Sequence, residues 1–176
     1  MNDARGSIEV RSTRMRRLLR APRERVYALL LDPTALPRWK VPDGMSLEVH
    51  EWEPREGGRI RVSLTYRDEG SAGKSAAHTD TYHGEFVHLV RDELIVERDE
   101  FETGDPAFRG AMTISFALTD AKGGTELVAT HDGVPPGVTL ADNELGWRMA
   151  LDKLAALVAD PGGSSETPIG AKTVVP

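Results

Sequence analysis

The 176-residue chain contains no cysteine, so disulfide bonds, thiolate metal sites and cysteine nucleophiles are excluded. It also lacks any apolar run long enough to span a membrane. Its first residues, MNDARGS, do not form the apolar stretch of a signal peptide. We therefore expect a cytoplasmic protein that does not bind membranes.

Positive charge is in the minority, with 22 lysines and arginines against 28 acidic residues and a formal net charge of -6. This balance disfavours a general nucleic-acid surface. The main basic cluster is the group of arginines in segment 14–25. A strand followed by a helix would spread these arginines over several faces, and no aromatic residues are interleaved among them to stack on bases. We expect no nucleic-acid partner.

Common catalytic and metal-binding motifs are also missing. There is no Gly-x-Ser-x-Gly and no phosphate-binding glycine-rich loop. His78, His83 and His88 are five residues apart, so on one strand their rings would alternate between faces. Three such rings cannot converge on one ion. We therefore predict no metal site and no cofactor, and the sequence assigns no catalytic residue.

The composition, 39% hydrophobic and 28% charged, fits a single folded domain. Residues 1–7 are polar, and residues 161–176 are rich in Gly, Ser and Pro and have no periodicity. Both ends are therefore predicted to be disordered. The predicted domain spans residues 8–160.

Alternation of apolar and polar residues predicts most of the domain to be strands. The predicted strands are 8–20, 45–50, 59–66, 79–90, 93–101, 111–119 and 125–132. In segment 111–119, for example, Met112, Ile114, Phe116 and Leu118 share one face. A sheet with one apolar face needs a cover, which another element has to supply.

Three segments have helical spacing instead. A first helix is expected from Pro22, which suits a first helical turn, to Asp32-Pro33, which ends it. A short turn at 34–39 follows. The longest helix is predicted at 139–160 and is the only element long enough to cover the sheet. Its apolar residues at helical spacing are Leu140, Trp147, Leu151, Leu154 and Val158.

A series of short motifs, each present once, follows a characteristic order along residues 15–158. They are Arg17, Ala21-Pro22, Val26-Tyr27, Asp32-Pro33, Leu36–Trp39, Gly57-Gly58, Tyr82 with Gly84-Glu85-Phe86, Gly124-Thr125, Leu127, His131-Asp132-Gly133, Gly146-Trp147, Leu151 and Leu154. In this order they resemble the helix-grip or START-like superfamily (SRPBCC proteins). More narrowly, they resemble the family of the C-terminal domain of the activator of the ninety-kilodalton heat-shock protein ATPase.

This resemblance implies an α+β helix-grip fold. In such a fold a curved antiparallel seven-stranded sheet wraps around a long C-terminal helix, with two short helices after the first strand. The sheet and the long helix enclose a cavity. The two short helices would close one end of it, and Trp39 is expected where this helix pair meets the mouth.

Eight residues are candidates for ligand contact in such a cavity. His131 alternates with apolar neighbours and is therefore aimed inward. Arg17 shares a face with Met15 and Leu19, so its guanidinium needs either a carboxylate or a ligand's carboxylate or phosphate. Glu97 or Asp99 is the expected carboxylate, although acids on strands are usually solvated. The predicted ligand-binding residues are Arg17, Trp39, Tyr66, Tyr82, Phe86, Phe116, His131 and Trp147.

Three functions remain open at this point. The first is a stand-alone binding module for a small, mostly apolar or amphipathic molecule. The alternative is an enzyme that resembles the polyketide cyclases and dehydratases of the same fold, since a fold alone does not decide function. The third is a chaperone-associated interaction protein. Pairing of two copies through a strand edge, as a homodimer, is left open as well.

Overall fold

The structure is a computed structural model and describes residues 11–68, 70 and 72–160. The predicted disordered segments 1–7 and 161–176 lie outside this range, as does the predicted start of the first strand. The elements are β1 (Ser12–Leu19), α1 (Arg23–Leu31), α2 (Leu36–Trp39), β2 (Met45–Trp52), β3 (Arg59–Tyr66), β4 (Thr79–Val90), β5 (Leu94–Phe101), the 3-10 helix η1 (Pro106–Phe108), β6 (Met112–Ala121), β7 (Gly124–Asp132) and α3 (Leu140–Ala159).

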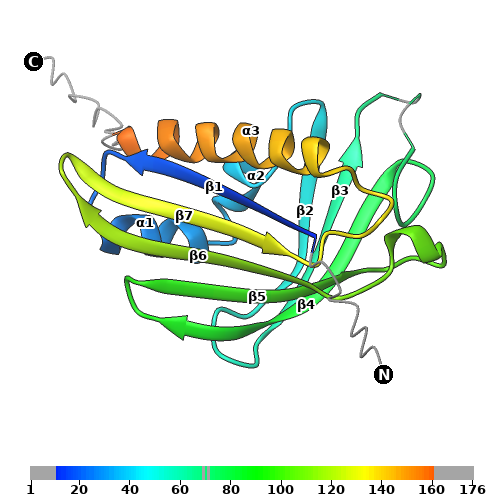
Figure 1. Cartoon of the computed structure of the whole chain (residues 1–176), viewed down its shortest axis with the longest axis horizontal. Coiled ribbons are helices and arrows are strands. Elements are labelled where there is room, and N and C mark those ends of the chain that lie inside the picture. Colours follow the sequence, from blue (N-terminus) through cyan, green and yellow to red (C-terminus); the bar gives the residue numbers. More distant parts are fainter. Residues whose placement is uncertain (1–10, 69, 71, 161–176) are drawn as a thin grey trace, which may run out of the picture.

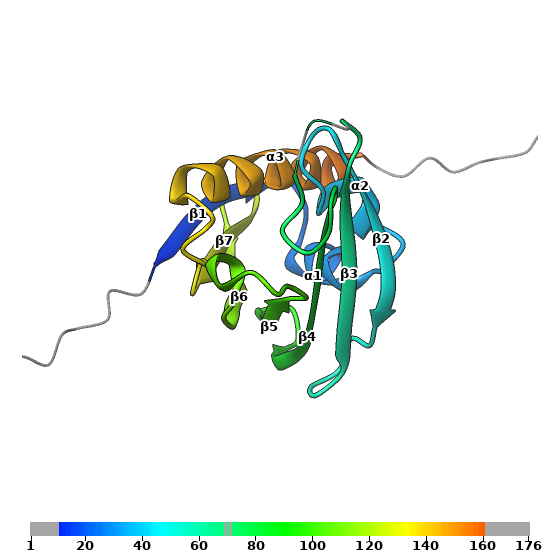
Figure 2. The same cartoon turned by 90° about the vertical axis from the view of Figure 1, so that its right-hand side faces the viewer.

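The seven strands form one antiparallel sheet in the order β1-β7-β6-β5-β4-β3-β2 (Figure 1). Because β1 and β2 are the two edges, α1 and α2 carry the chain from one edge to the other. The register shifts between Val49 and Glu51 in β2 and between Phe86 and His88 in β4. Such bulges bend a strand. Figure 2 shows the curved sheet with α3 across its open side, which confirms the helix-grip prediction.

The two short helices form where the sequence predicts them. Pro22 precedes α1 directly, and Val26 and Leu30, one turn apart, are its buried residues. In α2 a proline occupies the first turn, where its missing N–H costs no hydrogen bond, and Leu36 and Trp39 are buried. Both helices therefore turn their apolar sides into the hollow of the sheet.

Helix α3 begins at a capped end, where the backbone N–H of Asp142 donates to Oγ1 of Thr139 at 3.0 Å. Its buried residues are Ala150, Leu151, Leu154 and Val158. Leu140 shares the helical spacing of the apolar residues but is 37% exposed, because the buried part of α3 begins only at Ala150. Among the described residues, no helix has the length and apolar character needed to cross a bilayer.

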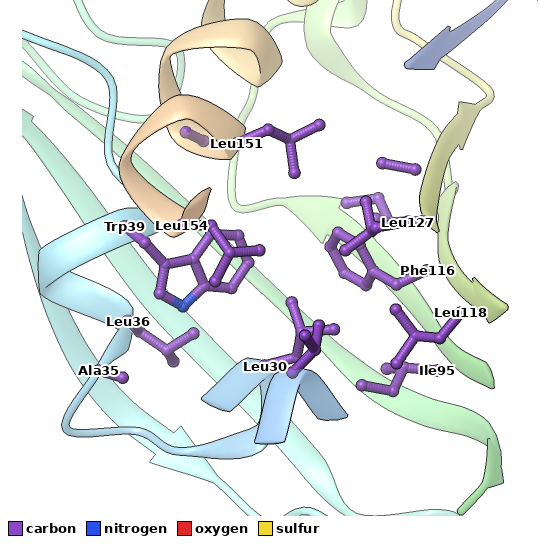
Figure 3. Close-up of a cluster of buried hydrophobic side chains, with 14 of the residues drawn as sticks. Leu30, Ala35, Leu36, Trp39, Ile95, Phe116, Leu118, Leu127, Leu151 and Leu154 are labelled. Atoms are coloured by element: carbon purple, nitrogen blue, oxygen red, sulfur yellow. The ribbon is translucent and has the colours of Figure 1, made fainter. Parts of the chain in front are cut away.

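The hydrophobic core fills one end of the hollow. Figure 3 shows Leu30, Leu36 and Trp39 from the short helices meeting Leu154 of α3 and Phe116 of the sheet. Trp39 is 0% exposed, and its ring meets that of Phe116 edge-on at 6.1 Å between centroids. The expectation that Trp39 stands at the mouth is therefore wrong. The helix pair packs its tryptophan into the closed end of the hollow.

Candidate functional site

The other end of the hollow, beneath the first half of α3, contains a pocket of about 570 Å³. Its wall is formed by the concave faces of the strands, by α3 and by the loops before β2 and β4. The large apolar side chains of this wall include Leu64, Phe101, Met112, Ile114 and Trp147. The pocket lies at the position where the family resemblance implied a cavity.

Four of the eight predicted site residues line this pocket. They are Tyr66, Tyr82, His131 and Trp147. Trp39, Phe86 and Phe116 lie in the core instead, each with at most 1% of its surface exposed. Phe86 packs edge-on against Trp52 at 5.0 Å, and Phe116 against Trp147 at 5.6 Å. Alternation identifies the inward face of a strand, but it does not say how far along the strand the packed core gives way to the pocket.

Arg17, the eighth candidate, lies at the sheet edge beside α3. Its guanidinium pairs with Oδ1 of Asp152 at 2.8 Å, and the two side chains are 44% and 52% exposed. The expected apolar surroundings and the expected pairing with Glu97 or Asp99 are therefore wrong. The reason is that β1 is an edge strand, so the guanidinium of Arg17 can reach past the sheet to a partly exposed carboxylate of α3.

A buried ion pair stands at the inner end of the pocket. Lys40 directly follows α2, and its Nζ donates to Oε2 of Glu97 at 2.6 Å. Both side chains are almost fully buried, at 8% and 2% exposure. Burial opposes the charge of Lys40, but Glu97, with smaller contributions from Tyr82 and Asp99, outweighs it and raises the lysine pKa. The ammonium also lies 5.3 Å from the ring centroid of Trp52, within cation–π range.

Asp99 lies two residues from Glu97 on the same inward face and also lines the pocket. It is 1% exposed, and neither carboxyl oxygen has a hydrogen-bond partner among the described residues. Burial is the main cause that raises its pKa well above the usual range, followed by the nearby Glu97, while Lys40 opposes the rise. The site therefore favours the protonated acid at Asp99.

His131 lies in β7, two strands from β5 in the same sheet, and is 7% exposed. Its Nδ1 accepts the indole N–H of Trp147 at 3.1 Å and lies 3.0 Å from Nδ2 of Asn143. Burial lowers the pKa of His131 to about 4, with Asp132 opposing and Lys40 adding to the effect. The imidazole is therefore neutral near pH 7, and its Nε2 is a buried atom without a partner among the described residues.

A second ion pair holds the loop between β3 and β4 against the pocket. Lys74, in this loop, pairs through Nζ with Oδ2 of Asp80, and its backbone N–H donates to Oδ1 at 2.5 Å. The ammonium lies 5.6 Å from the ring centroid of Phe101 and 5.9 Å from that of Tyr66. Asp80 is 2% exposed, so this pair attaches the loop firmly to β4.

The three histidines with five-residue spacing do not form a site. His83 and His88 are more than half exposed, and each lies near one carboxylate, Glu102 for His83 and Glu56 for His88. Within the part of the chain that the structure describes, no group of three His, Asp or Glu side chains is arranged to hold a metal ion.

The sequence interpretation missed Lys40. It left Glu97 and Asp99 open between pairing with Arg17 and solvation, whereas both are buried and neither pairs with Arg17. A signal for the acids was present, because Glu97 and Asp99 alternate in phase with Ile95 and Phe101 and so fall on the apolar face of β5. For Lys40 the sequence carried no comparable signal. It stands outside any periodic element, directly after a one-turn helix.

Comparison with known proteins gives consistent matches. The family model described as "Activator of Hsp90 ATPase homolog 1-like protein" matches residues 20–159. The crystal structure of a protein from Chromobacterium violaceum is 32% identical in sequence and has a TM-score of 0.75. The alignment covers 84% of this chain and 96% of that one. A comparison with curated proteins gives no significant match.

More distant structures share the fold. A protein from Rhodobacter sphaeroides is 22% identical with a TM-score of 0.70, over 84% of this chain and 91% of that one. The AHSA1-like protein from Aeromonas hydrophila is 16% identical with a TM-score of 0.64, over 85% and 92% of the two chains. Both alignments span nearly the whole of the related chain, so they describe the same single domain.

Proposed function

This chain belongs to the family of activator of Hsp90 ATPase homolog 1-like proteins, and we propose that it binds a small, mostly apolar molecule in the pocket between the sheet and α3. The observation that carries the proposal is the pocket itself. Its volume of about 570 Å³ is within the range of small-molecule sites, roughly 300–1,000 Å³. A cytoplasmic location, expected from the sequence, is part of the same proposal.

The chemistry of the wall supports a guest with one polar end. Apolar and aromatic side chains make up most of the surface, including Phe101, Ile114 and Trp147. Two inward-facing polar groups, on His131 and Asp99, have atoms without hydrogen-bond partners among the described residues. Small-molecule sites combine such an apolar surface with a few polar groups that orient the ligand.

Binding linkage provides the test. A ligand at a hundred times its dissociation constant stabilises the folded chain by about 2.7 kcal/mol, which raises the melting temperature of a domain of this size by about 5–10 °C. The measurement is a thermal-shift screen of fatty acids, polyketides, steroids and aromatic compounds against the full chain. If no compound raises the melting temperature at concentrations well above a plausible dissociation constant, the proposed function is wrong.

A matched pair of variants on α3 locates the binding. Gly146 lines the pocket, and an added Cβ there would meet nothing nearer than Cγ of Pro42 at 3.9 Å. Gly146→Leu should therefore fold and place its side chain in the space a ligand needs, which reduces the thermal shift. Ala156→Leu, on the exposed side of the same helix, should leave the shift unchanged.

A second candidate is an enzyme of the polyketide cyclase or dehydratase type. The observation that favours it is the pair of shifted ionisable groups in one pocket, a raised pKa at Asp99 and a lowered pKa at His131. Such groups are suited to general acid and general base roles. The test is whether the chain converts a compound that it binds. If Asp99→Asn still binds this compound but no longer converts it, the enzyme is favoured over the binding module.

A further inference from the structure

The protonation state of His131 follows from its hydrogen bonds. The indole of Trp147 can only donate, and it donates to Nδ1 of His131 at 3.1 Å. Nδ1 must therefore present its lone pair. Because the neutral imidazole carries one hydrogen, that hydrogen is on Nε2.

A second contact fixes the same arrangement. The hydroxyl of Thr13, in β1, lies 2.5 Å from Oδ1 of Asn143, in α3, and can donate to it. With its oxygen engaged in this way, Asn143 presents Nδ2 to Nδ1 of His131 at 3.0 Å. Two donors, on Trp147 and Asn143, thus converge on one ring nitrogen. The ring is held in one tautomer and one orientation by groups from β1 and α3.

The N–H group at Nε2 of His131 has no hydrogen-bond acceptor among the described residues. His131 is 7% exposed and belongs to the pocket wall. A buried donor left without an acceptor is costly, so a guest that brought an acceptor to this part of the pocket wall would satisfy it. Asp99, whose pKa is raised by burial and by Glu97, lines the same pocket.

We propose that the pocket selects molecules whose polar end is a carbonyl oxygen, which accepts the Nε2–H hydrogen bond of His131. This inference rests on the proposed function and names the class of ligand. A carbonyl satisfies the donor and needs no acceptor in return. A hydroxyl would bring a hydrogen of its own, and the acceptors beside the ring, Nδ1 of His131 and Oδ1 of Asn143, are already engaged.

Charged ends suit the pocket less well. A carboxylate would lose its hydration in a wall that is mostly apolar, and the ammonium groups of Lys40 and Lys74 are already paired with Glu97 and Asp80. An amine would enter a pocket that these two lysines line, and beside His131 it would offer donors to a group that also donates. The neutral carbonyl is the group that the chemistry of the wall fits.

Matched ketone and hydrocarbon pairs test the inference. The pairs are propionylnaphthalene with propylnaphthalene, a steroid ketone with its parent hydrocarbon, and dodecanone with dodecane, each titrated into the full chain. At least one ketone should bind about tenfold more tightly than its hydrocarbon partner, the size of one net hydrogen bond. In that complex the infrared carbonyl band should lie at lower frequency than in an apolar solvent.

Variants of the ring give the second measurement. His131→Leu removes the donor, so the ketone and its hydrocarbon partner should then bind with about equal affinity. His131→Gln keeps an N–H in a side chain that can also accept, and part of the preference should return. The infrared band is measured on the unsubstituted chain, so it decides the matter even if His131→Leu does not fold.

The outcomes separate the two proposals. Equal affinities within every pair that binds, with an unshifted carbonyl band, would overturn the carbonyl site and leave the binding function in place. Failure of all six compounds to bind would overturn the carbonyl site, and the thermal-shift screen would then decide the binding function by itself. A ketone preference with a shifted band that disappears in His131→Leu would establish the site.

Discussion

Gly84 and Asp99 face each other across β4 and β5, and a Cβ added to Gly84 would lie 2.1 Å from Oδ1 of Asp99. The same Cβ would lie 2.2 Å from the backbone carbonyl oxygen of Arg98. Both distances are far shorter than a van der Waals contact. The absence of a side chain at position 84 therefore leaves room for the buried carboxyl of the candidate site.

Replacing this glycine should destabilise the fold. In Gly84→Ala the new methyl group must displace the backbone of β5 or the Asp99 carboxyl, an overpacking that costs about 1–3 kcal/mol. The measurement is the free energy of unfolding in urea. Gly104→Ala is the control, because an added Cβ at Gly104 meets no atom within 4 Å. Equal stability of the two variants would show that the strands accommodate a side chain at position 84.

The Lys40–Glu97 pair gives a larger expected effect. Lys40→Met leaves the Glu97 carboxyl buried without its partner, and breaking a buried pair in this way costs about 3–5 kcal/mol. Chemical denaturation of the variant measures this loss. Arg55→Met, which breaks a pair whose arginine is 68% exposed, should cost less than about 1 kcal/mol.

A second substitution separates loss of the pair from loss of packing. In Lys40→Met/Glu97→Leu both charges are removed together, and much of the stability lost in Lys40→Met should return. A double variant as unstable as the single one would mean that the lysine, whose ammonium lies over the rings of Trp52 and Tyr82, stabilises the site through those contacts rather than through its pair with Glu97.

Much of the fold can be predicted from the local alternation of apolar and polar residues in the sequence. In β6 the alternation of Met112, Ile114, Phe116 and Leu118 predicts an inward face, and all four are buried. His131 lies inward where its alternation places it. These predictions succeed because the side-chain period of a strand is a local property.

The polar end of the site depends on contacts that no local pattern contains. Glu97 faces inward by alternation, and its charge has a partner there because Lys40, 57 residues earlier in the chain, reaches it. Arg17 has the pattern of an inward residue, yet it pairs with Asp152 of the last helix at an exposed edge. Whether a charged side chain is paired in the interior depends on partners from distant elements. Periodicity alone therefore predicts which face of a strand is apolar, but it does not predict the ion pairs of the candidate site.

Asp99 should make stability depend on pH in an unusual direction. Its folded-state pKa is raised by burial and by Glu97 against the opposition of Lys40, so the folded chain holds a proton that the unfolded chain releases near pH 4. This stabilisation is complete below the unfolded-state pKa and is lost as pH rises towards the folded-state pKa. The loss is at most about 1.4 kcal/mol per pH unit.

Asp99→Asn removes this proton and keeps the shape of the side chain. The measurement is the free energy of unfolding in urea of the original chain and of Asp99→Asn between pH 4 and 8. The difference between the two curves isolates the effect of Asp99, because the other groups titrate in both chains. The stability of the original chain relative to the variant should fall as pH rises. Parallel curves would mean that Asp99 is ionised in the folded state and that the pocket carries a carboxylate instead of a donor.

Arg17 should contribute little to stability or binding. Its pair with Asp152 is exposed on both sides, so Arg17→Ala should cost less than about 1 kcal/mol. The affinity for any compound found in the thermal-shift screen should be unchanged, since Arg17 is remote from the pocket wall. Isothermal titration of that compound checks this, and a clear loss of affinity would restore Arg17 as a ligand anchor.

Trp147 should control the protonation of His131. In Trp147→Phe the ring remains but the indole N–H is lost, so Nδ1 of His131 is held by one donor and accepts a proton more readily. The pKa of His131, about 4 in the original chain, should therefore rise, because a hydrogen bond to the neutral form is lost. NMR of the imidazole nitrogens measures this pKa and also shows which nitrogen carries the hydrogen.

Trp52→Phe is the matched control for this experiment. It removes an indole N–H that donates to the carbonyl oxygen of Leu31 at 2.8 Å, at the opposite edge of the sheet from His131. The His131 pKa should therefore stay near 4 in this variant, and the hydrogen should stay on Nε2. The NMR signals of the original chain could instead show the hydrogen on Nδ1. Trp147 would then not donate to Nδ1, and Nε2 would be an acceptor. Carbonyl selection, which depends on a donor at Nε2, would be excluded.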